Sequence, residues 1–298
     1  IIGIIDTGVN SDHPSFADLG GDGYDHTNPW GPNQYVGDCV EDKEHIQCND
    51  KLIGVRSYDI ITDSFSAMIP GGPAIGEDYQ GHGSHVASTA AGNVVKDVPY
   101  MVAGTGNELD GKIIKEALFP EISGVAPHAN IISYQVCHSS NDSGYRGCPG
   151  EALVAGIEDA ISDGVDVINF SIGGADSNVW ADPVQLAFLS AREAGINVAA
   201  AAGNSGTGVC GGSECMGYLD NSSPWLAQVA ATTHGREVEI ETSIEYAGFI
   251  DPEMGSEVPS WSDIGLIGGA IKNEEITGVV VWAKDYEDIN GDKDSNGY

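Results

Sequence analysis

Three short strings carry residue types that cooperate in covalent hydrolysis. Asp6 stands in IIDTGVNSDHP, His82 in GHGSHVAS and Asn204 in AAGNSG. A buried carboxylate can orient an imidazole and stabilise its charged form, the imidazole can act as general base, and a side-chain amide can donate to developing negative charge. The set predicts a hydrolase.

Each string also has a simpler interpretation. Asp-Thr-Gly occurs in aspartic proteases too, but those enzymes need two such carboxylates and this chain has one such string. His82 could be a structural histidine, or form a metal pair with His85, for which no further ligands stand at a suitable spacing. Asn-Ser-Gly is ordinary turn chemistry. The prediction therefore depends on the three strings occurring together.

The elements that must position these residues alternate between short apolar strands and longer helical stretches as far as about residue 234. Strands are predicted at 1–5, 129–136, 165–170 and 196–202, and helices at 150–163 and 183–194. This alternation predicts an α/β fold of three layers, a parallel sheet with helices on both faces. Asp6, Ser171 and Asn204 each come just after a strand, so we expect them to meet at the carboxyl edge of that sheet.

Composition and charge narrow the partners. No apolar run in the 298 residues approaches the roughly 20 that a membrane-spanning helix needs. A formal charge of −33, from 45 acidic against 12 basic residues, repels nucleic acid and anionic membranes. The charge therefore predicts a solvated acidic surface without a nucleic-acid or membrane partner. We also expect a monomer.

Six cysteines fall into three pairs that are close in sequence. The pairs are Cys39 with Cys48, Cys137 with Cys148, and Cys210 with Cys215. Disulfides closing such short loops are typical of secreted proteins, although six cysteines allow 15 pairings. A zinc site is the competing interpretation, and the absence of a Cys-x-x-Cys string weighs against it.

Taken together with GVAPHA (124–129) and SIGG (171–174), the three strings resemble the subtilisin-like serine proteases, the subtilase or peptidase S8 family, over roughly residues 1–234. The resemblance implies that Asp6 orients the imidazole, that His82 is general base and then acid, and that Asn204 donates to the oxyanion. It implies a protein or peptide substrate, and a propeptide is compatible with it. The backbone expected to flank the substrate includes Ser171, Gly173, Gly174, Ala202 and Gly203.

The string CNDKLIGVRSY (48–58) and the chain beyond Gly235 are similar to the plant cucumisin-like branch and related bacterial enzymes. In that branch a protease-associated domain is inserted between the string that contains the asparagine and a Gly-Thr-Ser-x-Ala string that contains the nucleophilic serine. No Gly-Thr-Ser-x-Ala string occurs in these 298 residues. We expect a catalytic domain over residues 1–245 and the start of a β-rich inserted domain over 246–298, with the nucleophilic serine beyond Tyr298. The isolated chain is then expected to be inactive. The alternative is a non-catalytic, peptide-binding pseudoprotease.

The last residues resemble the opening of a calcium loop. Asp292, Asp294 and Asn296 place oxygen ligands at alternating positions before Gly297. An acidic turn without metal is the competing interpretation. We expect any calcium to be structural, because the proposed chemistry needs no cofactor.

Overall fold

The structure is a computed structural model of the 298-residue chain. It describes residues 1–41, 45–63, 75–101, 113–138, 147–174, 178–204, 209–210, 213–214 and 219–232. Residues Ile1–Ala231 form a compact unit. The expected inserted domain over 246–298 lies outside the described residues, as does the calcium loop, and both stay predictions.

A seven-stranded parallel sheet forms the centre of the described fold. In spatial order its strands are β11 (Ala227–Val229), β8 (Asn197–Ala201), β7 (Val167–Phe170), β1 (Ile2–Asp6), β6 (Ile131–Gln135), β3 (Leu52–Arg56) and β2 (Val36–Gly37). The central strand β1 lies between β6 and β7, with Ile5 opposite both Tyr134 and Phe170. Strands β7, β8 and β11 follow on one side of β1, and β6, β3 and β2 follow on the other. Strands from distant parts of the sequence therefore lie side by side.

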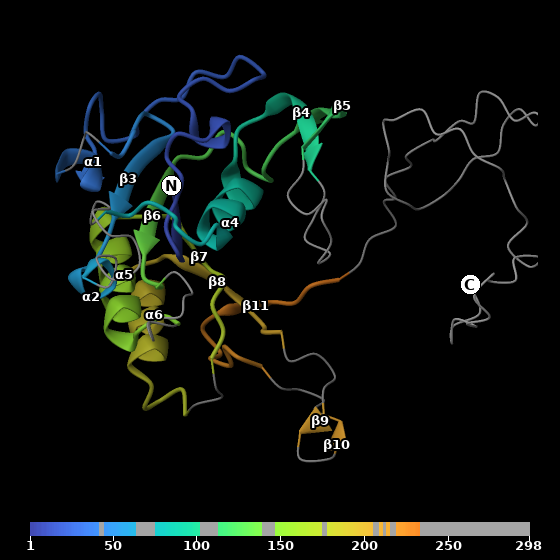
Figure 1. The fold of residues 1–298 in the computed structure, drawn as a ribbon. Coiled ribbons are helices and arrows are strands. Elements are labelled where there is room, and N and C mark those ends of the chain that lie inside the picture. The colour runs from blue at the N-terminus through green and yellow to red at the C-terminus, as the bar shows by residue number, and fades with distance from the viewer. Residues whose placement is uncertain are drawn as a thin grey trace, which may run out of the picture. The chain divides into compact units, whose positions relative to one another are not determined.

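Helices cover both faces of the sheet, which confirms the expected three-layer α/β class (Figure 1). Successive residues of β1 point to opposite faces, so Ile4 packs with Ala87 and Ala91 of α4 (His82–Ala91), whereas Ile5 belongs to the other core. That second core is covered by α5 (Gly150–Asp163) and α6 (Pro183–Glu193). Burial on both faces explains why the strands are almost continuously apolar.

The ends of the two longest helices follow from local sequence. Gly164 adopts φ +70° after α5, a left-handed conformation that costs glycine little, and so terminates the helix where the sequence predicts. Before α6, the Asp182 carboxylate accepts a hydrogen bond from the amide of Val184 at 2.9 Å, and Pro183 occupies the first turn. The observed bounds of α5, α6, β7 and β8 lie within two residues of those predicted.

Shorter elements surround this frame. They are the 3-10 turn η1 (Pro14–Phe16), the helices α1 (Asp38–Glu41) and α2 (Asp59–Thr62), and two antiparallel ribbons, β4 (Val95–Met101) with β5 (Ile113–Ile122) and β9 (Val209–Cys210) with β10 (Ser213–Glu214). The β4–β5 ribbon was not predicted from the sequence.

Two of the three expected disulfides are present, Cys39–Cys48 and Cys137–Cys148. The third expected pair cannot be compared, since Cys215 lies outside the described residues. Among the helices of the described chain, none combines the length and apolar character needed to cross a bilayer.

Candidate active site

Asp6 and His82 meet at the carboxyl edge of the sheet. Asp6 ends β1 and His82 begins α4, and the distance between Asp6 Oδ1 and His82 Nδ1 is 2.7 Å. The Asp6 side chain is only 1% exposed, whereas that of His82 is 47% exposed. A buried carboxylate thus holds an imidazole that solvent can reach.

When Asp6 is ionised, its hydrogen bond with His82 fixes the tautomer of the imidazole. An ionised carboxylate only accepts hydrogen bonds, so Nδ1 carries the proton and donates it to Asp6 Oδ1. The other ring nitrogen, Nε2, is then the basic one. This is the arrangement that a histidine general base requires.

Burial raises the pKa of Asp6 above its ordinary value of 3.8. The hydrogen bond from His82 and one from the amide of Thr7, at 2.8 Å, oppose that rise. The remaining carboxylate oxygen, Oδ2, has no hydrogen-bond partner among the described residues. Hydrogen bonds from His82 and Thr7 therefore stabilise the charged form of Asp6, while burial and the nearby charge of Asp78 oppose it.

The glycine after His82 brings α4 against the loop that follows β1. A side chain at Gly83 would overlap the backbone of Thr7 and Gly8. In the close approach that glycine permits, the Gly83 amide donates to Thr7 Oγ1 at 2.7 Å. The Gly-His-Gly string therefore has a steric reason, since a Cβ at this position would push His82 away from Asp6.

Asp78 organises the same junction and was missed by sequence reasoning. Its Oδ1 accepts from Thr7 Oγ1 at 2.9 Å and from the Gly81 amide at 2.7 Å, and its Oδ2 accepts from the Ser84 amide at 2.8 Å. These amides lie at the start of α4, where helix N–H groups lack intrahelical partners. A usable signal was an acidic residue shortly before a Gly-His helix start, the position of capping carboxylates.

A cavity of about 280 Å³ adjoins the Asp6–His82 pair. Its lining residues are Asp6, Thr7, Gln80, His82, Cys137, His138, Gly147, Cys148, Ser171 and Ile172. The Cys137–Cys148 disulfide thus forms part of its wall, and burial lowers the pKa of His138 there. The hydroxyl of Ser171 donates to Asn169 Oδ1 at 2.9 Å.

The backbone segments expected to flank a substrate follow the adjacent strands β7 and β8. Gly173 and Gly174 are exposed, and Ala202 and Gly203 are half-buried. Asn204 is exposed and comes three residues after the end of β8. The structure therefore brings Asp6, His82 and Ser171 to one cavity, while Asn204 is not among the residues that line it.

A buried amide fastens these two segments to each other. Asn221 is 2% exposed, and its Nδ2 donates to the carbonyl oxygens of Ile172, at 3.0 Å, and Ala201, at 2.9 Å. Its Oδ1 accepts from Gln185 Nε2 of α6 at 3.3 Å. Sequence reasoning missed Asn221, because nothing in NSSPW (221–225) marks it before the fold joins the segments.

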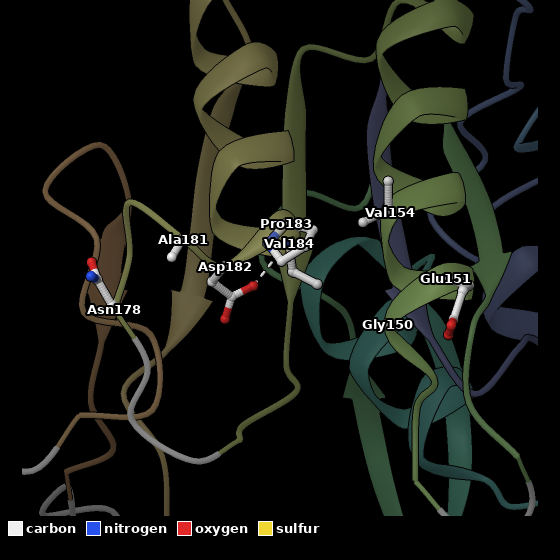
Figure 2. Close-up of a pocket in the computed structure, with 8 residues that line it drawn as sticks. All are labelled: Gly150, Glu151, Val154, Asn178, Ala181, Asp182, Pro183 and Val184. Atoms are coloured by element: carbon white, nitrogen blue, oxygen red, sulfur yellow. Dashed lines mark hydrogen bonds between the residues drawn. The ribbon is translucent and has the colours of Figure 1, made fainter.

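The larger cavity, of about 860 Å³, lies between the first turns of α5 and α6 (Figure 2). Gly150, Glu151 and Val154 line it from α5, and Asn178 and residues 181–184 line it from the other side. Neither His82 nor Asp6 lines it, so the smaller cavity is the candidate active site. The described residues contain no group of three or more potential metal-ligating side chains.

Comparison with known proteins agrees with this geometry. The profile described as "Subtilase family", peptidase S8, matches residues 1–272. "Subtilisin-like protease SBT4.15" from Arabidopsis thaliana is 32% identical over 240 residues, covering 80% of this chain and 26% of that protein. "CO(2)-response secreted protease" from the same plant is 33% identical over 244 residues, with 80% and 26% covered. The chain thus spans about a quarter of the length of these relatives.

Among solved structures, the chain is similar to "Structure of Prenylagaramide maturation protease PagA", with a TM-score of 0.35 and 17% identity over 69% of this chain and 46% of that one. The profile match, which covers most of the chain, identifies the family. The chain belongs to the subtilase family.

Proposed function

We propose that the protein is a secreted serine endopeptidase that uses an Asp/His/Ser triad. The observation that carries the proposal is the 2.7 Å hydrogen bond between buried Asp6 and accessible His82 at the wall of a cavity, in a chain of the subtilase family. The two disulfides and the name of the secreted relative support the extracellular location.

In the proposed reaction, His82 Nε2 takes the proton of a serine hydroxyl as the serine oxygen bonds to the peptide carbonyl carbon. Asp6 stabilises the imidazolium that forms. The amide of Asn204 donates to the oxyanion, a contribution worth about a hundred- to a thousand-fold in turnover where it has been measured in subtilisin. His82 then protonates the departing amine, and water hydrolyses the acyl-enzyme by the same route.

The nucleophile in this proposal is a serine outside the 298 residues, because no Gly-Thr-Ser-x-Ala string occurs among them. The exposed backbone at Gly173 and Gly174 supports binding of an extended peptide as an added strand. A propeptide could occupy the same backbone. The calcium ligands Asp292, Asp294 and Asn296 and the monomeric state remain part of the proposal.

A fluorophosphonate probe tests the function, since it labels only an activated serine. We expect stoichiometric labelling of the protein that contains this chain together with a following Gly-Thr-Ser-x-Ala string, and loss of labelling in its His82→Ala variant. The 298-residue chain alone should not be labelled. Absence of labelling in the longer protein, with intact folding, would favour the peptide-binding pseudoprotease.

A further inference from the structure

The side chain of Asp220 lies close to both of the segments that follow β7 and β8. For a Cβ built on Gly173 of the first segment, the three nearest atoms all belong to the Asp220 side chain, and the same holds for Gly203 of the second. A side chain on either segment would overlap the carboxylate. Gly203 has a φ of +102°, which favours glycine, and at both positions the absence of a side chain leaves room for the Asp220 carboxylate.

The position of Asp220 is fixed by its backbone and by its neighbour. The Asp220 amide donates to the carbonyl of Ala202 at 3.1 Å. Asn221 ties Ile172 to Ala201 through its buried amide. The backbone that carries the Asp220 side chain is thus tied to both segments before any ligand arrives.

The carboxylate of Asp220 lacks a cationic or hydrogen-bonding partner among the described residues. The residue is half-buried, so its charge is only partly solvated. By contrast, buried Asp163 in the same fold accepts two hydrogen bonds from Arg56, at 2.8 and 2.6 Å. A half-buried carboxylate without a partner in the described part of the chain is suited to receive a cation from outside the chain.

The segment that carries Gly173 begins at the cavity beside His82. Ile172, adjacent to Gly173, lines the cavity beside His82, so the segment runs from the reacting centre to the carboxylate. A Cβ on Gly174 would meet no atom within 4 Å, so the segment is open there. A peptide paired with this backbone would direct alternate side chains to each face of the added strand, and one of them would point between the two segments.

We propose that Asp220 selects peptide substrates with an arginine or lysine side chain, which enters between residues 171–174 and 201–203 and pairs with the carboxylate. The proposal rests on the proposed function, because it specifies the substrate of the same site. A guanidinium offers two parallel hydrogen bonds to a carboxylate, so arginine should be preferred to lysine.

Binding to the 298-residue chain tests the charge preference without any need for cleavage. The probes are acetyl-Ala-Ala-Arg-Ala-amide and the same peptide with citrulline, which has the shape of arginine but no charge, titrated by NMR. We expect the arginine peptide to bind at least about tenfold more tightly, and Asp220→Asn to reduce this ratio to below about twofold.

Glu193→Gln is the matched control, because it removes one negative charge from an exposed position of α6. It should leave the ratio unchanged. Unfolding curves would show that Asp220→Asn is folded, which we expect because the two side chains have the same shape and no hydrogen bond of the carboxylate is lost. Equal binding of the two peptides to the unaltered chain, absence of binding of both, or an unchanged ratio in Asp220→Asn would overturn the proposal.

Cleavage of a mixed peptide library by the longer, fluorophosphonate-reactive protein separates this inference from the function. We expect arginine and lysine to be enriched at one position near the cut, and Asp220→Asn to remove that enrichment while cleavage continues. Cleavage without such enrichment would overturn the role of Asp220 and leave the protease function intact. A failure to cleave any peptide would count against the function, and the binding ratio would still decide the role of Asp220.

Discussion

Asp6 shows how a functional residue can work against folding. Its carboxylate is buried at the end of β1, where desolvation raises its pKa although His82 and Thr7 donate hydrogen bonds to it. A raised pKa means that ionisation is less favourable in the folded than in the unfolded chain. The stability that Asp6 contributes is therefore full below its ordinary pKa of 3.8 and declines as pH rises through the folded value.

Asp6→Asn separates the role of Asp6 in catalysis from its effect on stability. In the longer protein, kcat should fall about ten-thousand-fold, because a neutral amide no longer stabilises the imidazolium or its reactive tautomer. In the 298-residue chain, the free energy of unfolding at pH 7 should be equal or higher, because an ionised buried group has been removed. Steady-state kinetics and urea unfolding measure the two quantities. A variant that kept kcat within tenfold would contradict the role assigned to Asp6.

Glu77, which precedes Asp78 beside the site, makes a second pH-dependent contribution to the stability of the fold. Burial, with further contributions from the nearby charges of Asp12 and Asp78, raises its pKa from 4.5 to about 7. Since the folded value exceeds the unfolded one, the stabilising contribution is present below about pH 4.5 and is lost as pH rises through about 7.

Glu77→Gln should therefore leave stability unchanged near pH 4 and raise the free energy of unfolding near pH 8. Glu77 is partly exposed, so solvent screening reduces the gain to roughly 1 kcal/mol. Urea unfolding across this pH range measures it. Glu193→Gln, at an exposed site on α6, serves as the control and should show no such trend. A gain that is the same at both pH values would argue against ionisation as the cause.

At the scale of elements, the sequence predicts the frame well because periodicity and end signals agree. The segment 150–163 has helical spacing of apolar residues and ends at Gly164, and the structure has α5 over Gly150–Asp163. The β4–β5 ribbon escaped prediction because its strands lack the period-2 alternation that marks a half-buried strand. Lys96, Asp97 and Pro99 in β4 are not typical strand residues, so tertiary pairing overrides local preference there.

Some residues of the candidate site could likewise be predicted from the sequence, and others could not. Asp6 and Ser171 could be placed from the sequence, because each follows a predicted parallel strand and such strand ends share one edge. For Asp78 the sequence held only the signal of a capping carboxylate, and for Asn221 it held none. The hydrogen bond from Thr7 to Asp78 and those from Asn221 to Ile172 and Ala201 join segments that only the completed fold brings together. Local patterns thus predict which elements form, while the contacts between loops depend on the three-dimensional arrangement.

Asn221→Ala tests how firmly the segments after β7 and β8 are joined. The change removes a side chain that is 2% exposed. It leaves the carbonyl oxygens of Ile172 and Ala201 and the side-chain amide of Gln185 without this hydrogen-bond partner. We expect a loss of about 2–4 kcal/mol in the free energy of unfolding, more than one ordinary hydrogen bond contributes, because the orphaned groups remain desolvated.

A double-mutant cycle with Gln185→Ala should show a coupling of at least about 0.5 kcal/mol, as expected for side chains in one network. Asn197→Ala, at an exposed position of β8, is the control and should cost less than about 0.5 kcal/mol. Additive effects of the Asn221 and Gln185 changes would contradict the shared network.

The whole molecule carries a charge that must weaken its own fold. The 45 acidic residues outnumber the 12 basic ones, and a net charge of −33 on 298 residues makes the compact state repel itself. Raising NaCl from about 0.05 to 0.5 M shortens the screening length from roughly 14 to 4 Å, so repulsion between more distant carboxylates is largely removed.

We therefore expect the free energy of unfolding to rise by roughly 1–3 kcal/mol over this range of salt, measured by urea unfolding at pH 7. Choline chloride at equal ionic strength should act like NaCl, because screening does not depend on which monovalent cation is present. Sucrose added at fixed low salt is a second control, because it shows how much an excluded cosolute raises the free energy of unfolding without screening. At pH 4, where many carboxylates are protonated, the salt effect should shrink. Stability that is independent of salt at pH 7, or that falls with salt, would show that the carboxylates lie too far apart, or are too well paired, for the net charge to oppose folding.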